Sequence, residues 1–100
     1  MGEERSIAMH RAIGERLRAD PALVETARKR VQSWLETGSV GGAYANAWAA
    51  LLAAPIDQLI DALVDPAEKA RALRQVSPFA GVLDPRTRWR IRRDVARAVK

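Results

Sequence analysis

The chain has 100 residues, no cysteine, and 17 basic against 12 acidic side chains, which gives a formal net charge of +5 at pH 7. The lack of cysteine excludes disulfides and thiolate metal sites, and no apolar run approaches the roughly 20 residues of a membrane-spanning helix. With 48% hydrophobic residues the chain is too apolar for disorder, so we expect a single helical domain over residues 1–100.

The N-terminus begins with the acidic residues Glu3 and Glu4, which do not suit a signal peptide. A chain without cysteine fits a reducing compartment, and the abundance of arginine and alanine is typical of a GC-rich bacterial gene. We therefore expect a cytoplasmic bacterial protein that does not engage a membrane.

Three Asp-Pro pairs, at residues 20–21, 65–66 and 84–85, punctuate the sequence. An aspartate carboxylate accepts hydrogen bonds from the first-turn amides of a helix, and proline fits the first helical position. Each pair therefore predicts the start of a helix. Glu68, three residues after Asp65, adds a capping-box-like pattern to the second of them.

The first two helices are predicted at about residues 4–19 and 21–37. Met9, Ile13 and Leu17 form a narrow apolar stripe along the first helix. The second helix has the strongest amphipathic pattern, and Gly38 follows it at the position where a helix-ending glycine belongs. The apolar stripe of the second helix consists of Leu23, Val24, Ala27, Val31, Trp34 and Leu35.

Three further helices are predicted after a glycine-rich loop, at about residues 43–54, 56–64 and 66–76. Pro55 separates the first two of them, because the residue before a proline avoids the helical region. The helix at 43–54 places its bulky side chains on one side, namely Tyr44, Trp48, Leu51 and Leu52.

Residues 77–83 (SPFAGVL) form an apolar segment in which Pro78 and Gly81 oppose a regular helix. Phe79 and its apolar neighbours are too hydrophobic to stay in water, so we expect this segment to enter the core. The last helix begins at Pro85 and runs to near the C-terminus. Since no stretch alternates with the period of a strand, the predicted fold is all-α, a compact bundle of five to six helices.

The last sixteen residues carry the charge imbalance. Residues 85–100 have a net charge of +6, whereas residues 1–84 have a net charge of −1. On a helical wheel one face is basic and the opposite arc is apolar. The basic face consists of Arg86, Arg90, Arg93, Arg97 and Lys100. The apolar arc consists of Ile91, Val95, Ala98 and Val99, with Arg88 and Arg92 at its borders.

Such a basic face can bind anions, because a guanidinium group donates two parallel hydrogen bonds to a phosphate or a carboxylate. The other interpretation is a solvated surface whose arginines pair with acids of the same chain, such as Asp57 and Asp61. Trp89 lies among the arginines, and three roles are open for it: stacking on a base, anchoring a protein interface, or covering the core beneath Phe79. Trp34 and Trp48 are predicted to be core residues.

No arrangement of side chains predicts catalysis, a metal ion or a cofactor. His10 is the only histidine, and without a partner base or nucleophile we expect it to be a structural or surface residue. The row Asp57, Asp61 and Asp65 could hold a hard cation but is more typical of a solvated face. The glycines of residues 38–42 match neither a P-loop nor a dinucleotide-binding pattern.

The stretch LRQVSPFAGVL at residues 73–83, followed by Asp84-Pro85 and then Arg88-Trp89, resembles a pattern in small bacterial proteins of about this length. They read LRQ-SPFAGVL-x-P-x-x-RW and begin with a segment similar to residues 9–12 (MHRA). Some of them resemble antitoxin-like components of toxin–antitoxin gene pairs. The resemblance implies an antitoxin-like or partner-binding role and supplies no catalytic residue.

We therefore expect a non-catalytic, antitoxin-like binding protein whose last helix engages a protein partner, such as a cognate toxin. The alternative is a nucleic-acid-binding module, a transcriptional regulator with the same arginines on phosphates. A helix-turn-helix made by the last two helices departs from the usual turn of 3–4 residues, because about eight residues separate them. A thin, alanine-rich core also leaves a homodimer open. The predicted binding residues are Arg86, Arg88, Trp89, Arg90, Arg93, Arg97 and Lys100.

Overall fold

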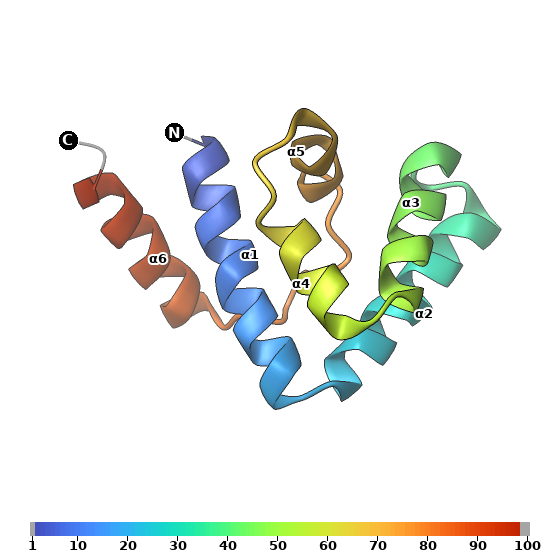
Figure 1. Ribbon diagram of the computed structural model, residues 1–100, viewed down its shortest axis with the longest axis horizontal. Helices are drawn as coiled ribbons and strands as arrows, with labels where there is room; N and C mark the ends of the chain where they lie inside the picture. The colour runs from blue at the N-terminus through green and yellow to red at the C-terminus, as the bar shows by residue number, and fades with distance from the viewer. Residues whose placement is uncertain (1, 99–100) are drawn as a thin grey trace.

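The computed structural model describes residues 2–98, and within them the chain forms six helices and no strand (Figure 1). The helices are α1 (Gly2–Ala19), α2 (Ala22–Thr37), α3 (Gly42–Ala53), α4 (Ile56–Leu63), α5 (Glu68–Arg74) and α6 (Pro85–Ala98). The predicted all-α bundle of five to six helices is confirmed, and the helix ends lie within a few residues of the predicted ranges.

Helix α1 is the centre of the bundle and packs against α2, α4, α5 and α6. Helices α2 and α3 pair at one end of the molecule, α4 and α5 lie against α1 and α3, and α6 lies at the opposite end (Figure 1). The buried Gly14 lets α1 and α4 approach closely, since a Cβ at this position would lie 3.2 Å from Ile60 Cγ2.

The core is built around Trp48, which is 1% exposed and lies edge-on to Phe79, with the ring centroids 5.7 Å apart. The indole N–H donates a hydrogen bond to the Leu73 carbonyl at 3.1 Å, so the ring is buried without an unsatisfied polar group. The other large buried side chains around this pair are Ile13, Leu17, Val24, Val31, Leu52, Leu59, Leu63 and Leu83.

Two aromatic predictions need correction. Trp34 is only half-buried, at the margin of the core, although its stripe on α2 is buried at Val24 and Val31. Tyr44, expected beside Trp48, is 43% exposed. It belongs to the first turn of α3, where a Cβ at Gly41 would lie 3.6 Å from Tyr44 Cδ2, so the ring lies against the preceding loop instead of the core.

The Asp-Pro pairs begin two of the three helices as predicted. Asp84 Oδ1 accepts a hydrogen bond from the Thr87 amide at 2.7 Å, and α6 begins at Pro85. Asp20 Oδ1 accepts one from the Ala22 amide at 3.3 Å, where α2 begins. At the third pair α5 begins two residues later, at Glu68, because Asp65 Oδ1 accepts from the Ala67 amide at 2.9 Å in a turn. The predicted capping box of Asp65 and Glu68 is therefore wrong.

Residues 75–84, the connector between α5 and α6, enter the core as predicted for this apolar segment. Pro78, Phe79 and Leu83 are buried, and Phe79 is 3% exposed. Gly81 adopts a φ of 87°, a left-handed conformation that side chains with a Cβ disfavour. The connector is therefore part of the packed interior and sets the point from which α6 departs.

Side chains of α1 and α2 hold the connector by hydrogen bonds. His10 Nε2 lies 3.0 Å from the Ser77 hydroxyl. On the other side, Arg30 Nη1 donates to the carbonyls of Pro78 at 2.9 Å and Ala80 at 3.0 Å. These bonds satisfy polar groups of an irregular segment that is packed against the core, where water cannot pair with all of them.

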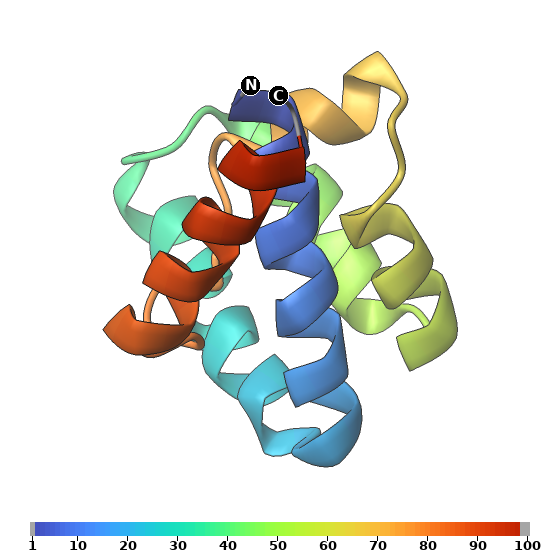
Figure 2. The same ribbon diagram turned by 90° about the vertical axis from the view of Figure 1, so that its left-hand side faces the viewer.

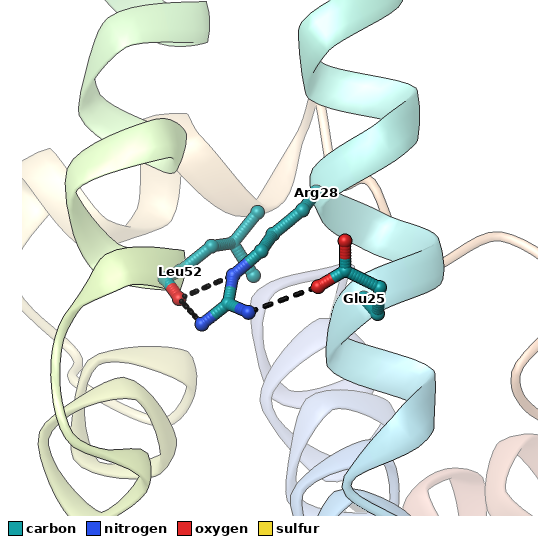
Figure 3. Close-up of polar contacts among 3 residues, drawn as sticks. All are labelled: Glu25, Arg28 and Leu52. Carbon is teal, nitrogen blue, oxygen red and sulfur yellow. Dashed lines mark hydrogen bonds and ion pairs between the residues drawn. The ribbon is translucent and has the colours of Figure 1, made fainter.

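Arg28 of α2 holds the C-terminal end of α3. Its Nε and Nη2 donate to the Leu52 carbonyl at 3.0 and 2.7 Å, while Nη1 donates to Glu25 Oε2 at 3.0 Å (Figure 3). The last carbonyls of a helix have no partner within the helix, so a guanidinium group there satisfies a carbonyl and complements the helix dipole. This contact fixes the α2–α3 pair at the end nearest to α4.

Candidate binding face on the C-terminal helix

Within residues 2–98, α6 packs against α1 and against no other helix. Figure 2 shows α6 running alongside α1 with no other helix in front of it. Thr87, Ile91 and Val95, spaced by four residues, are the half-buried side chains of α6, and Ile91 reaches the margin of the core. One side of α6 is thus anchored on α1, and the remaining sides face solvent.

The start of α6 is fixed electrostatically as well as by packing. The backbone and hydroxyl hydrogen bonds from Thr87 lower the pKa of Asp84, and the nearby charges of Arg86 and Arg90 act in the same direction. An ionised carboxylate at this position complements the positive end of the helix dipole. The first turn of α6 is therefore held in place although most of its side chains are exposed.

All six arginines of α6 are exposed: Arg86, Arg88, Arg90, Arg92, Arg93 and Arg97. One of them, Arg93, forms an ion pair within the described residues: its Nε lies 3.7 Å from Asp94 Oδ1. The other five form no ion pair with the carboxylates of residues 4–97, whose side chains the structure describes. Asp57, one of the acids considered as their partner, pairs with Arg18 of α1 at 2.8 Å instead. Lys100 lies outside the described residues.

Trp89 is 61% exposed, the highest value among the large hydrophobic residues that are exposed. The guanidinium carbon of Arg93 lies 4.9 Å from the centroid of its ring, in a cation–π contact. A role for Trp89 as a cover of the core beneath Phe79 is therefore wrong. The reason is the helical phase: at 100° per residue, Trp89 lies about 160° from Ile91, which faces α1. Trp89 stands near the middle of the exposed side and not at its edge.

We call the exposed surface of α6, apart from Asp94 near its border with α1, the outward face; it consists of Pro85, Arg86, Arg88, Trp89, Arg90, Arg92, Arg93, Ala96 and Arg97. It contains six of the seven predicted binding residues, and the structure brings these six onto one continuous helix surface. Arg92 was missing from the prediction, although its spacing of four residues from Arg88 could have indicated that both share a flank.

His10 is 6% exposed and uses both of its ring nitrogens. Nδ1 lies 2.8 Å from the Ser6 carbonyl, which can only accept, so Nδ1 carries the proton and Nε2 accepts from the Ser77 hydroxyl. Burial lowers the pKa of His10, and the charge of Arg74 acts in the same direction against the opposing effect of the Ser6 bond. The geometry is that of a neutral imidazole that ties α1 to the connector.

A hollow of about 290 Å³ opens beside this pair and is also lined by Arg74 and Arg88. A serine hydroxyl within reach of a histidine nitrogen is a spacing that nucleophilic catalysis uses. Here the Ser77 oxygen also lies 3.3 Å from the Phe79 amide, which donates to it. The hydroxyl is thus engaged in holding the connector, and the hollow offers no second base.

The described residues contain no group of three or more histidine or carboxylate side chains that could hold a metal ion. The row of aspartates on and after α4 is solvent-exposed, and two of its three members have separate partners, Arg18 for Asp57 and the Ala67 amide for Asp65. In residues 2–98, no helix combines the length and the apolar character needed to cross a bilayer.

The last two helices do not form a helix-turn-helix. Ten residues, 75–84, separate α5 from α6, and the two helices do not contact each other. Comparison with known proteins adds no family: no family model matches the sequence, and the searches of curated proteins and of solved structures found no match.

Proposed function

We propose that this protein is a non-catalytic, antitoxin-like binding protein that engages an acidic surface of a protein partner through the outward face of α6. The observation that carries the proposal is the exposure of Trp89, 61% of whose surface is open to solvent among arginines. Tryptophan and arginine dominate the energetic centres of protein interfaces. An indole in the middle of a charged surface gains much by burial against a partner.

The arginines supply attraction and orientation. Six arginines face only two nearby acids, Asp84 close to Arg86 and Arg90 and Asp94 beside Arg93, so α6 keeps a positive charge that steers an approaching acidic surface toward it. Guanidinium groups then pair with carboxylates in two-bond geometry. Because α6 is anchored on α1, little helix ordering is needed on binding. The cysteine-free chain suits a reducing bacterial cytoplasm as the place of this encounter.

The second candidate is a nucleic-acid-binding module, a regulator in which the same face contacts phosphates. It is supported by the row Arg86, Arg90, Arg93 and Arg97 along one flank, and by an exposed indole that could stack on an unpaired base. The two functions differ in salt dependence. Phosphate binding releases counterions and weakens steeply with salt, whereas binding centred on Trp89 weakens less.

A photo-reactive amino acid at position 89, introduced in the cells that encode the protein, tests the proposal. We expect a discrete cross-linked protein partner that is absent when the same group replaces Tyr44, an exposed aromatic residue far from α6. With that partner purified, Trp89→Ala should weaken binding by roughly thirtyfold, equivalent to about 2 kcal/mol.

Each control variant removes the same kind of side chain as a test variant, but away from α6. Leu35→Ala removes another exposed hydrophobic side chain, and Lys29→Ala with Lys69→Ala removes two exposed charges away from α6. Both should leave the affinity unchanged, whereas Arg90→Ala with Arg97→Ala should reduce it. Cross-links to nucleic acid alone, with a steep salt dependence, would establish the second candidate. Equal affinity for the Trp89→Ala and wild-type proteins would rule out the proposal.

A further inference from the structure

The outward face of α6 has an internal order that an evenly basic helix would lack. At 100° per residue, Pro85, Trp89 and Ala96 lie within about 40° of one another and form an uncharged stripe. All three are exposed. The stripe lies opposite the side that packs on α1. Helix α6 therefore has two uncharged sides, one of them anchored and one of them without a partner in residues 2–98.

Arginines border this stripe on both flanks. Arg88 and Arg92 lie on one flank. The other flank consists of Arg86, Arg90, Arg93 and Arg97, and all six arginines are exposed. The mean directions of the two rows are about 150° apart around the helix axis. In paired helices, charged positions lie in this way on both sides of an uncharged seam.

The spacing of the stripe also favours a helix as its partner. Residues 85, 89, 92 and 96 follow the alternating steps of four and three residues that make the seam of paired helices, with charged residues at the flanking positions. The seam position 92 is an arginine. Its aliphatic part can pack on an apolar surface while its guanidinium group points toward solvent or a flanking carboxylate. Charge complementarity requires the flanks of the partner helix to be acidic.

We propose that the occupant of this face is an acidic amphipathic helix of the partner protein, with an apolar stripe on Trp89 and carboxylates along both flanks. The inference rests on the proposed function and adds the kind of structure that α6 recognises. With 14 residues, α6 is long enough to contact about four turns of a parallel or antiparallel helix.

Among the helices of residues 2–98, only in α4 do acidic side chains outnumber basic ones, so α4 is the candidate that a second copy of this chain would offer. The acidic side of α4 carries Asp57 and Asp61, but its apolar residues Leu59 and Leu63 are buried in the core of its own molecule. Asp57 is also engaged by Arg18. The acids of α4 therefore do not border an apolar stripe that Trp89 could contact, and the partner helix belongs to another chain.

Synthetic peptides test the geometry with the full-length protein. The probe is a capped helical peptide of about 14 residues with leucine at the seam positions and glutamate on both flanks. One comparison peptide has the same composition in scrambled order, which keeps the charge and removes the stripe. A second has glutamine for glutamate, which keeps the stripe and removes the charge. Titration calorimetry gives the affinities, and amide chemical shifts locate the peptide.

We expect the acidic amphipathic peptide to bind at least roughly tenfold more tightly than either comparison peptide, with shift changes concentrated at residues 85–97. Trp89→Ala should reduce its affinity by a similar factor. Arg88→Ala with Arg92→Ala should reduce it, and so should Arg90→Ala with Arg97→Ala, because both flanks are in contact. Lys29→Ala with Lys69→Ala is the charge-matched control and should bind as the wild type does.

Three outcomes of the binding measurements would overturn the inference: equal affinity for the scrambled peptide, an unchanged affinity when one of the two arginine rows is removed, or tighter binding of duplex or single-stranded DNA than of the peptide. Self-association that depends on Trp89, seen by sedimentation, would assign the face to a second copy and also overturn it. The proposed function fails separately, since a protein cross-link through position 89 would survive a failure of the peptide to bind.

Discussion

His10 shows how one buried side chain can make this small bundle sensitive to pH. Its Nδ1–H donates to the Ser6 carbonyl within α1, and its Nε2 accepts from Ser77 of the connector. A second proton on the ring would have to sit on Nε2, where the Ser77 hydroxyl now donates. Burial and the charge of Arg74 both oppose that protonation and lower the pKa of His10 below 6.5.

The stability of the protein should therefore fall in mild acid. Because the unfolded chain binds the proton at the ordinary pKa of 6.5 and the folded chain binds it only at lower pH, the free energy of unfolding is greatest above pH 6.5. It should decrease as the pH falls from 6.5 toward the folded-state pKa, by at most about 1.4 kcal/mol per pH unit. Urea unfolding followed by tryptophan fluorescence measures the slope.

His10→Gln is the control for this prediction. His10 is the only histidine, so the variant should show a nearly flat free energy of unfolding between about pH 7.5 and pH 5, above the range in which carboxylates titrate. An identical slope for wild type and variant would assign the acid sensitivity to other groups.

At the scale of single residues, the sequence predicts the burial of side chains that follow a local apolar pattern. The burial of Trp48 and Phe79 follows from apolar periodicity and from the cost of leaving an aromatic ring in water, and the structure confirms both. The bond between His10 and Ser77 joins residues 67 positions apart, so no local pattern could reveal it. Three roles were open for Trp89 from the sequence, and the phase of α6 on α1 excludes one of them, the cover of the core.

At the scale of helices and loops, the same Asp-Pro motif leads to different local structures. The Asp84-Pro85 pair begins α6 directly, whereas after Asp65-Pro66 the chain makes a turn before α5 begins at Glu68. Arg74 supplies the difference: its Nη1 donates to the carbonyls of Leu63 at 3.2 Å and Asp65 at 2.7 Å. A tertiary contact thus holds the chain before α5 in a turn. The Asp65 carboxylate accepts its hydrogen bond from the Ala67 amide in this turn and not from an amide in the first turn of α5.

The connector should be sensitive to the conformation of Gly81. Its φ of 87° is unfavourable for a residue with a Cβ, and a Cβ built there meets no atom within 4 Å. Gly81→Ala should therefore destabilise the protein through the backbone alone, by about 1–2 kcal/mol. Urea unfolding provides the measurement, and the peptide affinity of α6 shows whether the helix still departs in the same direction.

Gly42→Ala is the matched control for Gly81→Ala. Gly42 is the first residue of α3, its φ is not positive, and a Cβ there also meets no atom within 4 Å. Alanine at this position should leave the stability unchanged or raise it by up to about 1 kcal/mol, because alanine is the better helix former. If both variants were equally stable, backbone strain at Gly81 would not control the connector.

At the scale of the whole molecule, residues 73–89 divide into two parts. Residues 73–83 supply buried side chains and the backbone groups that Trp48 and Arg30 contact. Residues 84–89 turn outward and end at the exposed Trp89. The first part is explained by packing, and the second part lies where the proposed partner binds. Periodicity predicts five to six helices, but it does not predict that α1 lies at their centre or that α6 packs against a single helix in residues 2–98.

This division predicts that α6 can be removed without unfolding the rest. All buried members of the hydrophobic core among the described residues lie between Ile13 and Leu83. A chain ending at Asp84 loses only the half-buried contacts of Thr87, Ile91 and Val95 with α1, which contribute about 2–4 kcal/mol, less than the usual stability of a domain of this size. It should still unfold cooperatively in urea, and its helical circular dichroism signal should be weaker than that of the full chain by the contribution of α6.

A chain ending at residue 76 is the contrasting variant. It also lacks the connector, so Phe79 no longer packs edge-on against Trp48 and Leu83 leaves the core. Loss of a buried aromatic ring alone costs about 3–5 kcal/mol, and we expect this shorter chain to lose its cooperative transition. The chain ending at Asp84 would then be folded but unable to bind the acidic peptide, which separates the scaffold from the binding helix. Loss of cooperative unfolding in that chain as well would instead make α6 part of the core, and an exposed binding helix could not be claimed.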